Sequence, residues 1–304
     1  MRYGLTRLVL ESNGFVALSE EEFETIKEAQ ENLFEALFIE ENFDLVVENY
    51  LEFEIDLLSA AARQMIHAMR KYDQYQEERR RINRRIANVL TACRSYLDQT
   101  GHHLSEMFGR DSAIESKFQQ GVSEQYERCA AYRVMYALRN YVQHRAYPIH
   151  CLTYPTQWVG DDHDKLLFSL TPLIYGQELE TDFMFNETVI NDLKALGEKI
   201  DVRPLMREYV SALGRIHEAL RALLSSEVQE WEKIILGTIK RFCDAFPEER
   251  STIGLTAVLE DDRGKHLERI VLFDDFIKYR HELERKTPSL VNLAKRYVTG
   301  EVTS

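Results

Sequence analysis

The sequence predicts a mainly helical protein of long helices, followed by a part that adds a few short strands. Over the first 150 residues, apolar side chains recur every three or four positions, as on one face of an α-helix. After Pro148 the pattern of apolar residues changes, and short apolar runs alternate with further helical stretches. We therefore expect a helical domain over 1–150, with an acidic N-terminal segment, and a mainly helical region over 151–304 that contains a β-hairpin.

Helical spacing and capping signals place the elements of the first half. Ser19 and Glu22 have the spacing of a capping box, which opens a helix. The apolar residues of the next helix recur at steps of three and four, and they are Phe43, Val46, Val47, Tyr50, Leu51, Ile55, Leu58 and Ala62. The sequence predicts a strand at 5–10 and helices at 19–38, 42–72, 79–107 and 113–146.

The second half mixes both kinds of element. Asp261-Asp262-Arg263-Gly264 lies between two apolar runs, which is typical of a hairpin turn. Pro155 indicates a loop around it. The sequence predicts a loop at 152–158, strands at 165–171, 253–259 and 267–272, and helices at 186–199, 202–246, 273–285 and 289–297.

The charges are distributed unevenly along the chain. The formal net charge is −13, which argues against a protein that binds nucleic acid over a broad basic surface. Residues 1–62 contain three basic residues and fifteen acids, whereas 63–94 contain nine basic residues and three acids. These two stretches attract each other. One hypothesis is that the acidic segment packs near the basic helix and competes there with phosphates, and the alternative is that both stretches are ordinary solvated faces.

The helix predicted just before Pro148 has two different faces. Ala131, Val134, Met135, Leu138, Tyr141 and Val142 form an apolar stripe. The opposite face is rich in groups that bind or protonate phosphate, namely Arg133, Tyr136, Arg139, Asn140, Gln143 and His144. We expect Arg139 and His144 to flank a shallow trough on this face, and Pro148 to stop the helix.

This segment resembles the HEPN family (higher eukaryotes and prokaryotes nucleotide-binding). The hallmark of that family is an Arg, a polar residue that is often Asn, a few more residues and a His, and the chain reads Arg139-Asn140-Tyr141-Val142-Gln143-His144. The resemblance covers roughly residues 42–150. It implies an all-helical, usually dimeric domain that is often a metal-independent ribonuclease of toxin–antitoxin or anti-phage systems, with an antitoxin or other regulatory partner.

The chemistry of RNA cleavage suggests a role for each residue. His144 is the candidate general acid or base, and Arg139 is the candidate cation on the phosphate. Asn140 would orient His144 or the phosphate. A two-fold dimer would bring two copies of His144 into one cleft, one as base and one as acid. We expect RNA contacts from Arg133, Tyr136 and Gln143, and from the basic helix through Arg79, Arg80, Arg84 and Arg85.

Other classes of function lack a sequence signal. Cys93, Cys129, Cys151 and Cys243 are scattered, and neither cysteine nor histidine has metal-ligand spacing, so we expect no metal and no cofactor. No apolar run has the length of a membrane span, and the N-terminus lacks a signal peptide, so we expect a cytoplasmic protein. The main alternative is a non-catalytic module that binds a nucleotide, RNA or a protein partner; a metal-dependent nuclease is a third.

Overall fold

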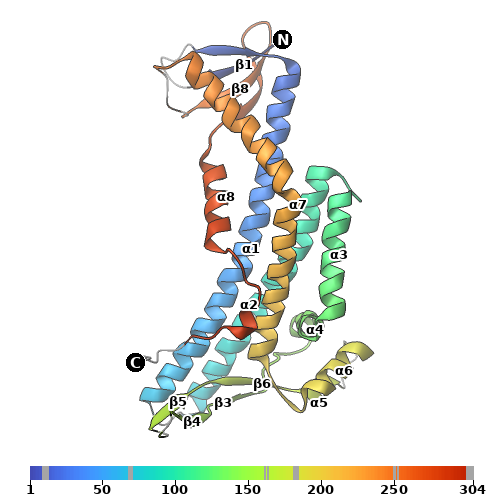
Figure 1. Cartoon of the computed structure of the whole chain (residues 1–304), viewed down its shortest axis with the longest axis vertical. Helices are drawn as coiled ribbons and strands as arrows, with labels where there is room; N and C mark the ends of the chain where they lie inside the picture. Colours follow the sequence, from blue (N-terminus) through green and yellow to red (C-terminus); the bar gives the residue numbers. More distant parts are fainter. Residues whose placement is uncertain are drawn as a thin grey trace. The chain divides into compact units, whose positions relative to one another are not determined.

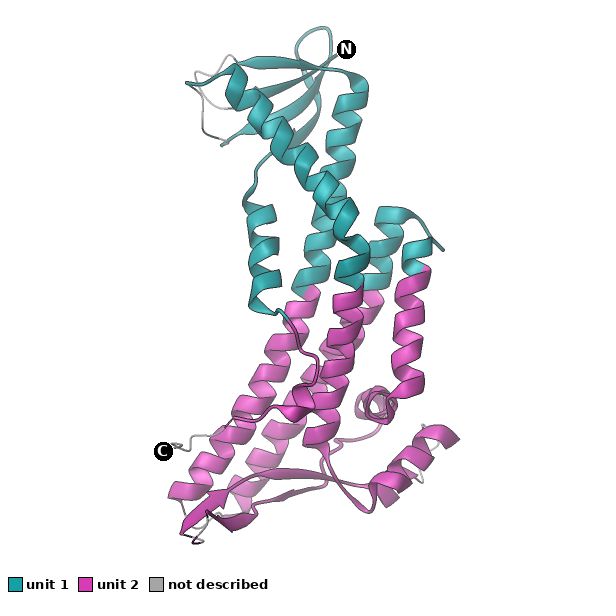
Figure 2. Cartoon of the chain, in the orientation of Figure 1, with its two compact units in different colours: residues 1–41, 100–115, 220–288 teal, residues 42–99, 116–219, 289–304 magenta. Residues whose placement is uncertain are grey.

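The computed structural model describes residues 1–8, 14–67, 71–160, 162, 164–180, 185–248, 251 and 253–298. Within these residues the chain is mainly helical, as the sequence predicts, with small antiparallel sheets (Figure 1). It divides into two compact units (Figure 2). Unit 1 comprises residues 1–41, 100–115 and 220–288, and unit 2 comprises 42–99, 116–219 and 289–304. Neither unit follows the expected division at residue 150, because long helices contribute residues to both.

Helix α1 (Glu20–Ile66) replaces the two helices expected over 19–72. Its capping box forms as predicted: the Ser19 N–H donates to Glu22 Oε2 at 2.7 Å, and the Glu22 N–H donates to Ser19 Oγ at 3.0 Å. The sequence has no glycine or proline between Gly14 and Gly101, so nothing interrupts the backbone hydrogen bonds near residue 40. Helix α2 (Tyr72–Phe108) likewise begins earlier than the expected residue 79.

The sheet of unit 1 pairs strands from the N-terminal residues with strands from residues 255–271. Its strands are β1 (Arg2–Arg7), β2 (Phe15–Leu18), β8 (Leu255–Glu260) and β9 (His266–Val271), in the antiparallel order β2-β1-β8-β9. The predicted hairpin is therefore confirmed as β8–β9, and Gly264 takes a positive φ of 78° in its turn. The strand expected at 5–10 is β1, which begins and ends earlier; Val9 and Leu10 lie outside the described residues.

Helices close the core of unit 1 beside this sheet. Helix α8 (Asp275–Lys286) confirms the helix expected at 273–285, and helix α7 (Val202–Ala245) confirms the one expected at 202–246. Leu5, Phe23 and Val258 are fully buried. Arg221 of α7 binds Glu40 of α1 through two hydrogen bonds of 2.9 and 2.6 Å, so a nearly buried carboxylate is paired with a guanidinium.

The core of unit 2 lies between the segments of α1, α2 and α7 that belong to it. His217 of α7 is 1% exposed and stacks on Phe43 of α1 with ring centres 3.7 Å apart. Its Nδ1 lies 3.0 Å from the hydroxyl of Tyr96 on α2. This histidine is thus a packed core residue with a hydrogen-bond partner, which removes it from consideration as a catalytic group.

The single helix expected at 113–146 is two helices, α3 (Ala113–Arg128) and α4 (Ala130–His144). Cys129 between them is extended, with φ −117° and ψ 104°, and its Sγ accepts the Tyr132 N–H at 3.4 Å as the N-cap of α4. The chain turns at this point, and Figure 1 shows α4 almost end-on beside the upright α3. Helical periodicity continues across the junction, which is why the sequence alone indicates one helix.

The segment after Pro148 contains more strands than the sequence predicts. Strands β3 (Cys151–Thr153), β6 (Thr171–Tyr175) and β7 (Lys199–Asp201) form one antiparallel sheet, and β4 (Thr156–Val159) pairs with β5 (Lys165–Phe168). The prediction of a loop at 152–158 was wrong, since β3 and β4 lie there. These short strands form because they pair with neighbouring strands, and their local sequence alone does not indicate them. The strand expected at 165–171 is divided between β5 and β6.

Two helices lie between strands β6 and β7. The short helix α5 (Gly176–Glu180) precedes α6 (Glu187–Leu196), whose N-cap Asn186 accepts the Val189 N–H at 2.9 Å, near the expected start at 186. The helix expected at 289–297 was wrong. Only a 3-10 turn, η1 (Leu293–Lys295), forms there, because Asn292 before it takes a left-handed φ of 61°.

In the part of the chain that the structure describes, the helices are too short or too polar to cross a lipid bilayer.

Candidate active site on helix α4

Helix α4 presents the two faces that the sequence predicts. Ala131, Val134, Met135 and Leu138 are buried, and Val142 is half-buried. Gln143 and His144 are exposed, whereas Arg139 and Asn140 are half-buried at the border between the faces. The helix ends at His144, four residues before Pro148, and the Arg145 N–H closes it by donating to the Tyr141 carbonyl at 2.8 Å.

Arg139 and Asn140 interact directly. Arg139 Nη1 donates to Asn140 Oδ1 at 3.1 Å. The Nε–H of Arg139 is shielded from solvent and has no hydrogen-bond partner in the described part of the chain. Arginine donates charge-assisted hydrogen bonds to anionic groups, and the half-buried Arg139 lies on the same helix as the exposed His144. Asn140 therefore orients the arginine, whereas the sequence suggested that it orients His144 or the phosphate.

Arg133 is engaged in structural contacts. Its Nε and Nη2 donate to the two carboxylate oxygens of Asp192 on α6, at 2.7 and 2.9 Å. Its Nη1 donates to the carbonyls of Tyr126 and Glu127 in the last turn of α3, at 2.8 and 2.7 Å. The side chain is only 13% exposed. Arg133 thus caps α3 and fastens α4 to α6, and contact with RNA would require these bonds to break.

Tyr136 is also held by neighbouring side chains. Its hydroxyl accepts from Arg94 Nη1 of α2 at 2.6 Å, and the Arg94 guanidinium carbon lies 5.4 Å from the centre of its ring. The edge of Tyr126 meets the same ring, with centres 5.9 Å apart. Since Arg94 also binds Asp98 at 2.8 Å, this group joins α2 to the polar face of α4.

The four arginines of α2 that were expected to contact RNA fall into two groups of two. Arg85 binds Asp56 of α1 at 2.7 Å and also pairs with Glu52, so the acidic segment does contact the basic helix at this point. Arg79 reaches the carbonyl of His150 at 3.4 Å. Arg80 and Arg84 are exposed, and because they are four residues apart they share one side of the helix. Of the predicted phosphate platform, these two are presented to solvent.

Asn83 is a residue that sequence reasoning missed. Its Oδ1 accepts the Ile149 N–H at 2.9 Å, and its Nδ2 donates to the Ile149 carbonyl at 3.5 Å. It is 2% exposed, and it therefore fixes the chain just after α4 against the stretch of α2 that carries Arg80 and Arg84. The signal available in the sequence was an uncharged Asn within a run of arginines.

His150 belongs to a second polar cluster, next to the hydrogen bonds between Asn83 and Ile149. Its Nδ1 accepts the Tyr175 N–H at 3.0 Å, its Nε2 lies 3.2 Å from Glu178 Oε2, and its ring stacks on that of Tyr175. Burial lowers the pKa of His150, although Glu178 acts in the opposite direction. Cys151 next to it lies 3.7 Å from the Tyr75 hydroxyl. The histidine is occupied on both nitrogens, which indicates a structural role.

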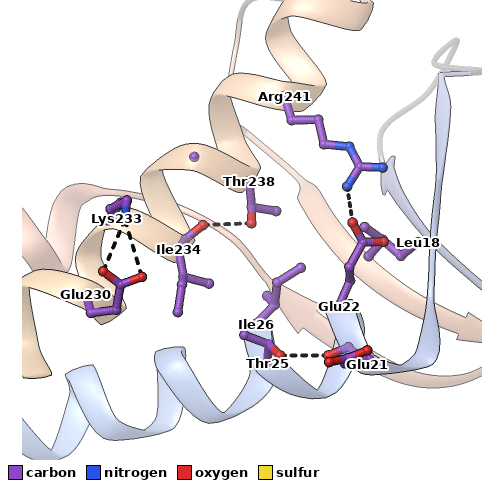
Figure 3. A pocket seen from close by; sticks show the side chains of 11 residues that line it. Leu18, Glu21, Glu22, Thr25, Ile26, Glu230, Lys233, Ile234, Thr238 and Arg241 are labelled. Carbon is purple, nitrogen blue, oxygen red and sulfur yellow. Dashed lines mark hydrogen bonds and ion pairs between the residues drawn. The ribbon is translucent and has the colours of Figure 1, made fainter.

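Unit 1 contains a groove of about 420 Å³ between α1 and α7 (Figure 3). Leu18, Ile26 and Ile234 supply its apolar lining. Four of its five charged residues form two ion pairs: Arg241 donates to Glu22 at 2.6 Å, and Lys233 lies 3.2 Å from Glu230, while Glu21 is the fifth. The described residues that line the groove include no histidine or cysteine, so they offer no group that exchanges a proton near neutral pH.

No three His, Cys, Asp or Glu side chains among the described residues are placed to hold one metal ion. No protein-family model, no curated protein and no solved structure matches this chain. The case for a function therefore rests on the residues of α4 and α2.

Proposed function

We propose that the chain is a metal-independent, HEPN-like endoribonuclease of a toxin–antitoxin or anti-phage system, with its active site at the end of α4. The observation that carries this proposal is the group formed by Arg139, Asn140 and His144. One helix carries a half-buried arginine, an amide that orients it and an exposed histidine. The exposed Arg80 and Arg84 lie on the stretch of α2 to which Asn83 ties the chain after α4.

In the proposed reaction, the 2′-oxygen of RNA attacks the adjacent phosphorus while the bond from phosphorus to the 5′-oxygen breaks. A base takes the proton of the 2′-hydroxyl, and an acid gives a proton to the departing 5′-oxygen. Arg139 stabilises the charge that builds up on the phosphorane. The products are a 2′,3′-cyclic phosphate and a 5′-hydroxyl. Since each chain supplies one motif histidine, a homodimer would supply His144 as base and its copy in the partner subunit as acid.

The first experiment is incubation of the purified protein with a mixed RNA pool in the presence of a chelator, followed by analysis of the product ends. Cleavage should persist, and His144→Ala should abolish it. Arg139→Ala should reduce cleavage by about 10²–10³-fold, the usual effect of losing one transition-state donor. Arg139→Lys should fail to restore it, because lysine lacks the planar fork.

The matched control is His102→Ala, since His102 is an exposed histidine on α2 whose carboxylate neighbour, Glu106, is 3.9 Å away. This variant should cleave like the wild type. Cleavage that survives in His144→Ala, or that stops when the chelator is added to the wild type, would refute the proposed mechanism.

The proposed RNA platform is tested separately by Arg80→Gln combined with Arg84→Gln. Each phosphate contact to a single strand adds about 0.7 to the slope of log affinity against log salt, so the double variant should flatten that slope by about 1.4. Arg128→Gln is the control, because Arg128 is 76% exposed and lies 3.8 Å from Glu124. Parallel salt lines for wild type and the double variant would mean that these arginines do not contact RNA.

A non-catalytic module that binds RNA, a nucleotide or a protein is the second candidate. The observation that favours it is the structural use of Arg133 and Tyr136, two expected RNA contacts, which leaves fewer groups on α4 to position RNA for cleavage. Binding that retains the predicted salt slope, together with intact RNA after incubation, would support this candidate over the nuclease.

A further inference from the structure

Strand β9 forms one edge of the sheet in unit 1, where the strand order is β2-β1-β8-β9. The hydrogen bonds between β8 and β9 show which of its backbone groups point outward. The Leu272 N–H donates to the Leu255 carbonyl at 2.8 Å, and residues of an antiparallel pair alternate between bonding the neighbouring strand and pointing away from it. The backbone N–H and C=O groups of Arg269 and Val271 therefore point away from β8.

A side-chain amide already bonds one of these outward groups. Gln30 of α1 is 7% exposed, and its Nε2 donates to the Val271 carbonyl at 2.6 Å. Gln30 thus takes the place that the main-chain amide of a further strand would take at this point. Among the residues that the structure describes, none bonds the backbone of Arg269 in the same way. Since β9 has six residues and no proline, its edge is able to pair with another strand.

A groove of about 330 Å³ lies between β9 and α1. Phe34 of α1 and Phe273 supply aromatic walls, with ring centres 6.3 Å apart, and Ile270 of β9 belongs to the same lining. Side chains alternate between the two faces of a strand, so the buried Ile270 and the exposed Arg269 point to opposite sides of the sheet. A strand added to the edge of β9 would direct every second side chain into this groove.

The charges differ on the two sides of β9. On the groove side, Lys27 of α1 binds Glu268 at 2.6 Å, and this carboxylate raises the pKa of Lys27, with a smaller effect from Glu31. On the other side Arg269 is exposed, and no described acid forms an ion pair with it. Charge complementarity therefore favours an added strand with apolar side chains in the groove and an acidic side chain opposite Arg269.

We propose that β9 is the docking edge for an extended segment of a partner protein, which adds antiparallel to the sheet. This segment places an acidic residue opposite Arg269, between two apolar residues that point into the groove. Antiparallel addition continues the pairing of the strands in this sheet. Main-chain hydrogen bonds to Arg269 supply affinity, and the alternating side chains supply specificity.

The docking edge lies wholly in unit 1, whereas α4 belongs to unit 2. The proposal is therefore independent of the proposed nuclease activity, and it is tested without RNA.

The first test uses a synthetic, end-capped peptide in which valine, glutamate and valine are flanked by threonines. A fluorescent label reports its binding to the full chain by anisotropy. The peptide should bind, and the Arg269→Glu variant should bind it about fivefold more weakly and should prefer the same peptide with lysine in place of glutamate. Binding of neither peptide to the wild type, or an unchanged preference in Arg269→Glu, would overturn the proposal.

The matched control is Arg263→Glu, because Arg263 is an exposed arginine in the turn between β8 and β9, outside the docking edge. This variant should bind the glutamate peptide like the wild type. A loss as large as that of Arg269→Glu would mean that only the overall charge of the hairpin attracts the peptide, which contradicts docking at the edge.

The second test changes the peptide and leaves the protein as it is, so that folding does not enter. An antiparallel strand bonds the Arg269 carbonyl through the N–H of its glutamate, whereas the N–H of the following valine points away from β9. Methylation of the glutamate nitrogen should weaken binding by about tenfold, and methylation of that valine nitrogen should leave it unchanged. Equal affinities of the two methylated peptides would rule out strand addition.

Sedimentation of the chain with and without the peptide separates a partner protein from a second copy of this chain. The peptide should leave the oligomeric state unchanged. An oligomer that dissociates as the peptide binds would mean that a second copy occupies the edge of β9, and the assignment to a different partner would then be wrong.

Discussion

Replacement of Arg133 by alanine should destabilise unit 2 rather than weaken RNA binding directly. The change removes two hydrogen bonds to Asp192 and two to the carbonyls that end α3. It leaves the Asp192 carboxylate, which is 14% exposed, without its guanidinium. The junction between α3, α4 and α6 therefore loses its main polar connection.

The magnitude follows from the degree of burial. Removing one partner of a fully buried ion pair costs about 3–5 kcal/mol, and exposed pairs contribute about 0–1 kcal/mol. Arg133 and Asp192 lie near the buried limit but retain some solvent contact. We expect Arg133→Ala to lower the free energy of unfolding by about 2–4 kcal/mol. Asp192→Ala should cost a similar amount, and the double variant should cost less than the sum because the two residues are coupled.

The assay is urea unfolding followed by circular dichroism, with Arg128→Ala as control. Arg128 is 76% exposed, so its removal should change stability by less than about 0.5 kcal/mol. If the chain binds RNA as proposed, the affinity of folded Arg133→Ala should keep the wild-type salt slope, because Asp192 and the carbonyls that end α3 engage the guanidinium. Full stability combined with a flattened salt slope would refute the structural role and return Arg133 to the RNA-binding set.

Three further predictions concern the cap of α1 and the pH dependence of stability. Ser19→Ala should cost about 1 kcal/mol in thermal or urea unfolding, because the Glu22 N–H loses its acceptor. The backbone N–H of Ser19, together with Arg241, holds the pKa of Glu22 below its usual value of 4.5. The stability that Glu22 contributes is therefore complete above pH 4.5 and is lost as the pH falls through the lower pKa of the folded state. The Glu22→Gln variant should accordingly lose less stability in acid than the wild type does. Burial lowers the pKa of His150 from 6.5. The contribution of His150 to the free energy of unfolding is therefore complete above pH 6.5 and is lost as the pH falls through the pKa of the folded state. The His150→Gln variant should flatten this part of a plot of stability against pH.

Local signals in the sequence determined much of the secondary structure. The capping box of Ser19 and Glu22 and the acidic turn that ends at Gly264 act through neighbours a few residues away, and both form as predicted. The helix expected from residue 186 begins directly after Asn186, which caps it. The two faces of α4 also follow from spacing alone, because a helix places every third or fourth residue on the same side. Spacing placed Arg139, Asn140 and His144 on the polar face, and the resemblance to the HEPN motif nominated them as a catalytic group.

Contacts between distant residues decided the rest, because nothing in local sequence encodes them. In the sheet of unit 1, β1 pairs with β8, which lies about 250 residues later in the sequence. Strands β3 and β4 form by pairing with β6 and β5, and the local sequence does not predict these pairings. Arg133 and Gln143 both fall on the polar face of α4, yet Asp192 and the end of α3 engage only Arg133 among the described contacts. On α1, periodicity showed that apolar residues are present, but only packing against α2 and α7 decided which face is buried and which remains exposed. An apolar pattern specifies that a side chain prefers burial, and the tertiary structure determines whether a partner is there to bury it.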